Sequence, residues 1–448
     1  MSDRMTLSGE ERLLQICAVA LDSSQADQTQ VTVTSVQSSL TRYANSIIHQ
    51  SVSEQDYEVA VKVAVGKRIG YASANKLSEE SVRATVGTAT RFARSMPEDP
   101  DFDHLPYRSE LYSRPATYCE STAAFGPEDR AQAVRQIVDV SREAADALAS
   151  GSVKITTSES AVANSFGVRA YSPSTSASLV VLTHTDDGTG WSEEHSREVS
   201  QISWADNARE ASAVCKRNRN QQDIEAGDYT VVLMPDAVID LVSMLGWMGF
   251  DAKSYQEERS FLRGRIGERL MSESISIYDD GADERGFARS FDGEGVPKQK
   301  VDLITNGVAM GVVYDSYTAG KDHRETTGHG TSRPQFQPYP LNLILAPGDA
   351  TLEDMIASTS CGILVSRFHY TNDIQPSETL ATGMTRDGTF LIEGGKLSHP
   401  VKNLRFTDKI IRAFSTVEAI GKDLKCSPGV AAPALKLGSF LFTSTTEF

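Results

Sequence analysis

The sequence lacks an unbroken apolar segment long enough to cross a membrane. Its longest apolar run, around residues 229–250, is interrupted by Pro235, Asp236 and Asp240, whereas a membrane helix needs about 20 consecutive apolar residues. The first residues, MSDRMTLSGEERLL, do not contain the apolar core of a secretory signal. We therefore expect a cytoplasmic protein that does not bind membranes.

The chain also has few cysteines, and it has fewer basic than acidic residues. The 448 residues contain five cysteines and no CxxC pair, which predicts free thiols in a reducing compartment. Lys and Arg number 44 against 60 Asp and Glu, so the formal charge is −16. Because phosphate contacts need clustered basic side chains, this balance opposes nucleic-acid binding.

Several common catalytic signatures are missing. The chain contains no HExxH, no GxSxG, no GxxxxGK[ST] and no GxGxxG after a strand. Their absence excludes the usual zinc-peptidase helix, the nucleophile elbow of α/β-hydrolases and the common phosphate-binding loops.

The patterns that are present predict an α+β protein. YEVAVKVAV, residues 57–65, alternates as a half-buried antiparallel strand does. Helices are expected over 8–21, after Ser78, and from Pro127 to a stop at Gly151. At this length we expect two domains: a mixed α/β domain over 1–220 and a β-rich domain over 221–448.

Two polar segments contain histidines. HTDDGTGWSEEH, residues 184–195, has side chains that could bind a divalent metal, but its glycines favour a solvated acidic hairpin tip. DHRETTGHG, residues 322–330, is interpreted as a loop, in which His329 either lines a cleft or lies on a plain surface.

Two further segments predict strands and turns. SRFHYTND, residues 366–373, is expected to be a strand with Arg367 and His369 on one face and a buried aromatic face of Phe368 and Tyr370. Asp387–Gly388 predicts a hairpin turn, and Gly394–Gly395 a second turn.

Several blocks, taken in order, resemble the TldD/PmbA family, once called modulators of DNA gyrase. They are ISIYDDG, FDGEGVPKQKVDLITNGVAMGVVYDSYTA, ETTGHG, TRDGTFLIEGGKLSHPVKNLRF and GKDLK, preceded by YEVAVKVAVGKRIGYASANKLSEESVRATVGTATRFAR. The resemblance covers nearly the whole chain. It implies an α+β N-terminal domain, a β-rich C-terminal domain and a dimer that encloses a cavity.

Metal-bearing members of this family are zinc peptidases with a His-Glu-x-x-x-His helix and a cysteine near the C-terminus. Counting back from Asp279–Asp280–Gly281 places that motif at Ser243, Met244 and Met248. Serine is a poor zinc ligand and methionine a soft one. Cys426 follows GKDLK directly, in a shortened segment, and is not expected to correspond to the family's cysteine.

The resemblance therefore implies the PmbA (TldE-like) branch. We expect a metal-free subunit of a peptidase, which binds extended peptide while a TldD-like partner supplies zinc. One alternative is a zinc-independent enzyme in natural-product biosynthesis, acting on a peptide or a thio-conjugate. Another is a non-enzymatic scaffold, as a homodimer. The candidate cleft residues are Tyr314, His329, Arg367 and His369, and no metal or other cofactor is expected in this chain.

Overall fold

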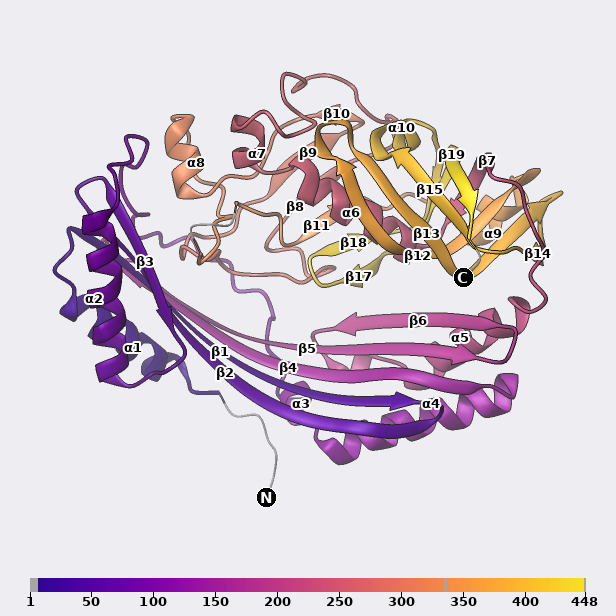
Figure 1. The fold of residues 1–448 in the computed structure, drawn as a ribbon, viewed down its shortest axis with the longest axis horizontal. Coiled ribbons are helices and arrows are strands. Elements are labelled where there is room, and N and C mark those ends of the chain that lie inside the picture. The colour runs from indigo at the N-terminus through magenta and orange to yellow at the C-terminus, as the bar shows by residue number, and fades with distance from the viewer. Residues whose placement is uncertain (1–6, 334–336, 447–448) are drawn as a thin grey trace.

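The computed structural model describes residues 7–333 and 337–446. The N-terminal half is built on one antiparallel sheet with the strand order β3-β2-β1-β4-β5-β6. Its strands are β1 (Gln28–Ala44), β2 (Ile47–Val65), β3 (Arg68–Ala74), β4 (Leu148–Asn164), β5 (Arg169–His184) and β6 (Thr189–Ser196). Four of these strands have 16 to 19 residues, and they sweep below the C-terminal half as a long curved surface (Figure 1).

Helices cover the two ends of this sheet. They are α1 (Glu10–Ser23), α2 (Glu79–Ser95), α3 (Glu120–Ala123), α4 (Pro127–Ala145) and α5 (Trp204–Arg217), with a 3-10 turn η1 (Val199–Gln201). In Figure 1, α1 and α2 lie at one end and α4 at the other. Ser78 caps α2 by accepting a hydrogen bond from Ser81 N. At Gly70 of β3, a Cβ atom would lie 2.1 Å from Ala89 O, so α2 packs directly on the strand.

The expected helix stop at Gly151 is wrong. Helix α4 ends at Ala145, and Asp146 adopts the left-handed conformation that closes it, with φ 49°. Asp can adopt this conformation at modest cost, so a glycine is not required there. Gly151 lies inside β4, where a Cβ would lie 2.0 Å from Val180 O.

The C-terminal half contains two further sheets. One has the order β10-β9-β8-β11-β18-β17, from β8 (Ile277–Asp279), β9 (Val301–Thr305), β10 (Val308–Ala309), β11 (Leu343–Leu345), β17 (Lys425–Ser427) and β18 (Val430–Ala432). The other contains β7 (Gly227–Leu233), β12 (Cys361–Gln375), β13 (Leu380–Glu393), β14 (Lys396–Pro400), β15 (Leu404–Lys409), β16 (Val417–Ile420) and β19 (Leu435–Thr445).

Five strands of the last sheet form a closed ring, because β12 pairs with both β7 and β13, and β19 and β15 complete the circuit. Phe368, Phe406 and Phe440 are buried in this region, with ring centroids 4.6 to 5.7 Å apart. The remaining helical segments are α6 (Pro235–Gly249), α7 (Ala252–Gln256), α8 (Ser316–Lys321), α9 (Leu352–Ala357), α10 (Ile410–Ser415) and the 3-10 turn η2 (Pro376–Glu378).

The architecture confirms the predicted α+β class with a β-rich C-terminal half. The domain boundary between residues 220 and 221 stays a prediction; α5 ends at Arg217 and β7 begins at Gly227. Among the helices of the described residues, none is long and apolar enough to span a bilayer.

The predicted turn at Asp387–Gly388 is not a hairpin end. Both residues have positive φ, 51° and 129°, as the sequence indicated, but they lie inside the continuous strand β13. The pairing register with β12 shifts between Val365 and Arg367, opposite this point. The sequence therefore marks a β-bulge, which needs the same backbone freedom as a turn. The second predicted turn, Gly394–Gly395, does join β13 to β14.

Candidate functional site

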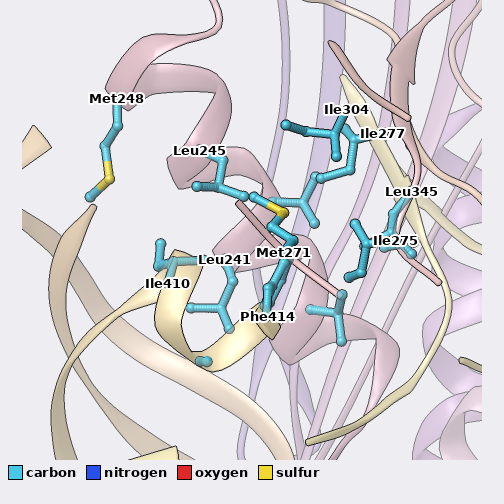
Figure 2. Packing of buried hydrophobic residues seen from close by; sticks show 14 of the residues in the cluster. Leu241, Leu245, Met248, Met271, Ile275, Ile277, Ile304, Leu345, Ile410 and Phe414 are labelled. Carbon is cyan, nitrogen blue, oxygen red and sulfur yellow. The ribbon is translucent and has the colours of Figure 1, made fainter. Parts of the chain in front are cut away.

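Helix α6 has two different faces. Leu241, Leu245 and Met248 form one stripe at helical spacing, and all three are buried in the core of the C-terminal half. Figure 2 shows these side chains on the side of α6 that faces Ile410 and Phe414 of α10. The other face carries Asp236, Asp240, Ser243 and Trp247, and Trp247 at its end is 57% exposed.

The three positions that the sequence predicts for the family's metal motif are divided between these faces. Ser243 is half-buried, whereas Met248 is 1% exposed and packs in the core. Residues five apart lie about 140° apart around an ideal helix, which agrees with this division. Met244 is half-buried and also packs against the core. The side chains at these positions are therefore a hydroxyl and two thioethers, one of which is buried in the core.

This donor set does not fit zinc. A zinc site needs three or four imidazole, thiolate or carboxylate ligands converging on one point. Cys426 lines the same pocket as α6, which is described below, and burial raises its pKa to about 12, so it is protonated at neutral pH. Within residues 7–333 and 337–446, no group of three His, Cys, Asp or Glu side chains is arranged to hold a metal ion.

A polar pocket lies where the two halves of the chain meet. Its volume is about 260 Å³. Strand β6, helix α6, strand β12 and strand β17 each contribute to it. The lining residues are Trp191, Glu193, His195, Asp236, Ile239, Asp240, Arg367, Phe368, His369, Tyr370, Thr371, Lys425, Cys426 and Ser427. We call this the β6–α6 pocket.

Arg367 and His369, two of the four predicted cleft residues, line the β6–α6 pocket. The guanidinium of Arg367 donates to Asp387 Oδ2 through Nε at 2.9 Å and lies 4.0 Å from the ring centre of Trp191. The β-bulge at Asp387 thus aims a carboxylate at Arg367. Burial and two neighbouring arginines lower the pKa of His369, so it is neutral at pH 7.

The expected buried aromatic face of β12 is wrong at Tyr370. Phe368 is 2% exposed, but Tyr370 is 69% exposed. Tyr370 has φ 51°, and the register with β13 shifts between His369 and Asn372. This second irregularity breaks the alternation on which the prediction depended.

Strand β6 contributes alternate residues to the pocket. Trp191, Glu193 and His195 face it, as the period of a strand requires, and His195 Nε2 lies 2.7 Å from Glu193 Oε1. The sequence prediction of a solvated hairpin tip therefore holds only for residues 185–188, the turn that follows β5. Beyond the turn, Glu193 and His195 lie on a strand and face the β6–α6 pocket, whereas Glu194 lies on the other face and accepts hydrogen bonds from Ser203 N and Asn207 Nδ2.

The carboxylates of α6 were not among the predicted site residues. Lys425 Nζ donates to Asp236 Oδ2 at 2.7 Å, while burial raises the pKa of Asp236. One turn later, burial, reinforced by the charge of Asp236, raises the pKa of Asp240 to about 7. The available signal was two acids at i, i+4 spacing within an otherwise apolar helix.

The other two predicted cleft residues lie elsewhere. His329 is 1% exposed, and its Nε2 lies 2.8 Å from Asp279 Oδ1. Tyr314 is 6% exposed, and its hydroxyl donates to Asp322 Oδ2 at 2.9 Å. Their backbones meet, since His329 N donates to Tyr314 O at 3.3 Å. Neither side chain lines the β6–α6 pocket.

The region around His329 is a buried ionic cluster. Lys298 Nζ lies 3.3 Å from Asp279 Oδ1, and Asn342 N donates to Asp279 Oδ2 at 2.7 Å. Burial opposes the charge on Asp279, but Lys298 and His329 outweigh it and lower the pKa of this carboxyl well below its ordinary value. At His329, burial and the charge of Lys298 act together and lower the pKa, against the opposing effect of Asp279.

Three of the sequence blocks that carry the family resemblance meet at this cluster. Asp279 comes from ISIYDDG and His329 from ETTGHG. Asp292 of FDGEG accepts hydrogen bonds from its own loop, from Glu294 N and Val296 N at 2.9 Å. Its other oxygen accepts one from Gly330 N at 2.6 Å. These motifs therefore tie three loops together.

Two profiles of one family match this chain. "PmbA/TldA metallopeptidase C-terminal domain" matches residues 226–444, and "PmbA/TldA metallopeptidase domain 1" matches residues 30–93. The first match spans nearly all of the C-terminal half, and the second covers a 64-residue part of the N-terminal half. The chain belongs to the TldD/PmbA family, as the sequence blocks predicted.

Individual relatives agree with this membership. An uncharacterised protein of Methanocaldococcus jannaschii is 26% identical over 80% of this chain and 83% of its own length. The metalloprotease PmbA homolog of Haemophilus influenzae is 22% identical over 91% of this chain and 90% of its own length. The crystal structure of TldE from Thermococcus kodakarensis has the same fold, with a TM-score of 0.87 at 19% identity, over 96% of this chain and all of that one.

Proposed function

We propose that this chain is a metal-free, TldE/PmbA-like subunit of a TldD/PmbA-type peptidase. In this proposal it helps enclose the cavity and binds an extended peptide, and a TldD-like partner supplies the zinc. The observation that carries the proposal is the composition of α6. By the count from Asp279–Asp280–Gly281, Ser243, Met244 and Met248 are predicted to occupy the positions of the family's two ligands and general base, and Met248 is part of the hydrophobic core.

The edge of the N-terminal sheet supports the peptide-binding role. Strand β6 ends the six-stranded sheet, and its outer edge forms no ladder with any strand in the described part of the chain. An unpaired edge can accept an extended peptide through backbone hydrogen bonds. Alternate side chains of β6 face the β6–α6 pocket, so a peptide on this edge would lie beside the pocket.

Co-expression with the TldD-like paralogue of the same organism tests the proposal. We expect a stable complex on size-exclusion chromatography, zinc only in the partner by elemental analysis, and peptide cleavage that needs both chains. A stable homodimer, whose mass and peptidase activity do not change when the partner is added, would contradict the proposal. Stoichiometric zinc in the isolated chain would contradict its metal-free character.

A second candidate function is zinc-independent catalysis in the β6–α6 pocket. It is favoured by the closely spaced Glu193 and His195 beside Asp240, whose pKa of about 7 suits proton transfer at neutral pH. Turnover by the isolated chain in the presence of a chelator would support it, provided that His195→Gln abolishes the turnover. If the chelated chain is inactive on peptides and thio-conjugates, this candidate fails.

A further inference from the structure

One carboxylate in the β6–α6 pocket, that of Asp240, has no hydrogen-bond or ion-pair partner in the described part of the chain. Glu193 lies against His195 at 2.7 Å, Asp236 is held by Lys425 at 2.7 Å, and Arg367 is held by Asp387. Asp240 makes no hydrogen bond or ion pair with any residue of 7–333 or 337–446. Because an unpaired carboxylate in a partly desolvated site is costly, this arrangement calls for an explanation.

The charges of the pocket favour a cation as the missing partner. Three carboxylates, those of Glu193, Asp236 and Asp240, line the pocket together with two permanent cations, Arg367 and Lys425. Arg367 is already paired with Asp387, which is not among the lining residues. An anionic ligand would be repelled by this balance, and a neutral ligand would leave Asp240 unpaired. A cation would complete the pairing of every charged side chain that lines the pocket.

The size and position of the pocket restrict the ligand further. Its volume of about 260 Å³ is below the range of roughly 300–1,000 Å³ that holds drug-sized molecules, so it can take one residue-sized group. Asp240 is on a helix packed into the core, which fixes its direction. Strand β6, whose outer edge forms no ladder among the described residues, forms the opposite wall.

We propose that Asp240 binds a protonated amine or guanidinium of a peptide in the β6–α6 pocket. The cation takes the place between α6 and β6, and the side chains of Trp191, Phe368 and Tyr370 surround its apolar part. The group is either the amino terminus of the peptide or a Lys or Arg side chain. This inference rests on the proposed peptide-binding role, but it concerns this chain alone and needs no partner subunit.

The test is a ligand-observed NMR titration of the isolated full-length chain at pH 8 with four peptides. Ala-Ala-Ala-amide offers a free amino terminus, whereas acetyl-Ala-Lys-Ala-amide and acetyl-Ala-Arg-Ala-amide each offer only a side-chain cation. Acetyl-Ala-norleucine-Ala-amide is the neutral match of the lysine peptide. We expect at least one cationic peptide to bind about tenfold or more tightly than the norleucine peptide, and the binding peptide identifies the source of the cation.

Two variants locate the site. Asp240→Asn should weaken binding of the cationic peptide by about tenfold or more, as expected for the loss of a charge-assisted contact. Asp302→Asn is the matched control, since Asp302 is an exposed acid whose ion-pair partner is Lys300; it makes the same change in net charge and should leave binding unchanged.

Thermal unfolding at pH 8 separates a binding role from a structural one. A residue kept for binding at a cost in stability gives a variant that is at least as stable as the wild type, so Asp240→Asn should melt at the same temperature or higher. The proposal is overturned if the norleucine peptide binds as well as the cationic peptides, or if none of the four binds. It is also overturned if Asp240→Asn retains binding or melts at a lower temperature. Complex formation with a TldD-like partner is measured separately, so the failure of one proposal is distinguishable from the failure of the other.

Discussion

Asp240 and Asp279 are both carboxylates withdrawn from solvent in the C-terminal half, and their environments are opposite. Asp279 is fully buried between Lys298, His329 and the backbone of Asn342, and its pKa is lowered. Asp240 borders the β6–α6 pocket without a hydrogen bond among the described residues, and its pKa is raised to about 7. Burial acts in the same direction on both groups, so the partners decide the difference.

The difference distinguishes a carboxylate that stabilises the fold from one that is free to bind a ligand. Asp279 has its hydrogen-bonding capacity used by three loops and can accept no ligand without loss of those contacts. Asp240 is held at an energetic cost on a rigid helix. Perturbed carboxyls of this second kind are concentrated at functional sites.

The largest effect is expected at Asp279. Asp279→Asn leaves Lys298 and His329 buried without their anion and should lower the free energy of unfolding by about 3–5 kcal/mol. Chemical denaturation at pH 7 measures it. Asp280→Asn is the matched control one residue away, where only a hydrogen bond from Ala282 N is affected, and it should cost about 1 kcal/mol or less.

The penalty at Asp279 should depend on pH. Its folded pKa is below the ordinary value of 3.8, so its contribution is complete above that value and is lost as the pH falls further. The difference between wild type and Asp279→Asn should therefore be constant from pH 7 to 5 and shrink below about pH 4. A difference that grows on acidification would contradict this assignment.

The next effect is expected at Arg367, the cation nearest to both Asp387 and the pocket. Arg367→Met leaves the buried Asp387 carboxylate unpaired and should cost about 2–3 kcal/mol. It should also raise the pKa of Asp240 further, because Arg367 lowers it in the wild type. Carboxyl-detected NMR titration measures the second effect. An unchanged pKa of Asp240 would show that the charge of Arg367 does not act on this carboxyl.

Asp240→Asn should raise the free energy of unfolding, in contrast to the two substitutions above. Because the folded pKa of Asp240 is raised from 3.8 to about 7, the group favours folding below its unfolded pKa, and this contribution is lost as the pH rises through 7. The variant should therefore be more stable than the wild type by about 1–3 kcal/mol at pH 8 and show a smaller gain at pH 5. Denaturation at both pH values, with Asp302→Asn as control, checks the sign.

The smallest effect is expected at Ser243, which shares the pocket-side face of α6 with Asp240. Ser243→Ala should change the free energy of unfolding by about 0.5 kcal/mol or less. By contrast, Met248→Ala on the opposite face should cost about 2–5 kcal/mol. Equal costs in the same denaturation experiment would show that the two faces of α6 are not as different as the structure indicates.

Much of the fold could be predicted from local patterns. The alternation of residues 57–65 and the capped helix after Ser78 depend on short-range periodicity, and the structure contains both. The predictions that failed needed information from other strands. Asp387–Gly388 and Tyr370 have positive φ within continuous strands, and a sequence signals the positive φ of a bulge in the same way as that of a turn.

The candidate site was predicted only in part. Arg367 and His369 line the β6–α6 pocket, whereas His329 lies in the buried cluster around Asp279 and the Tyr314 hydroxyl is bonded to Asp322. Both pairs were selected because they belong to family-like loops, and such membership does not distinguish a ligand-facing side chain from one that braces a loop. The i, i+4 spacing of Asp236 and Asp240 in an apolar helix was visible in the sequence. Whether these acids line a pocket depended on which elements pack against the helix.

The sequence by itself determined the α+β class, the family and the absence of zinc ligands at residues 243–248. These follow from residue identity, spacing and short-range periodicity. Only the tertiary structure decided which charges are paired. Asp236, Glu193, Arg367 and Lys425 come from four elements spread over more than 230 residues, and Coulomb interactions depend on the final distances between atoms. Folding brings these four residues around Asp240 and leaves that one carboxylate open to a ligand.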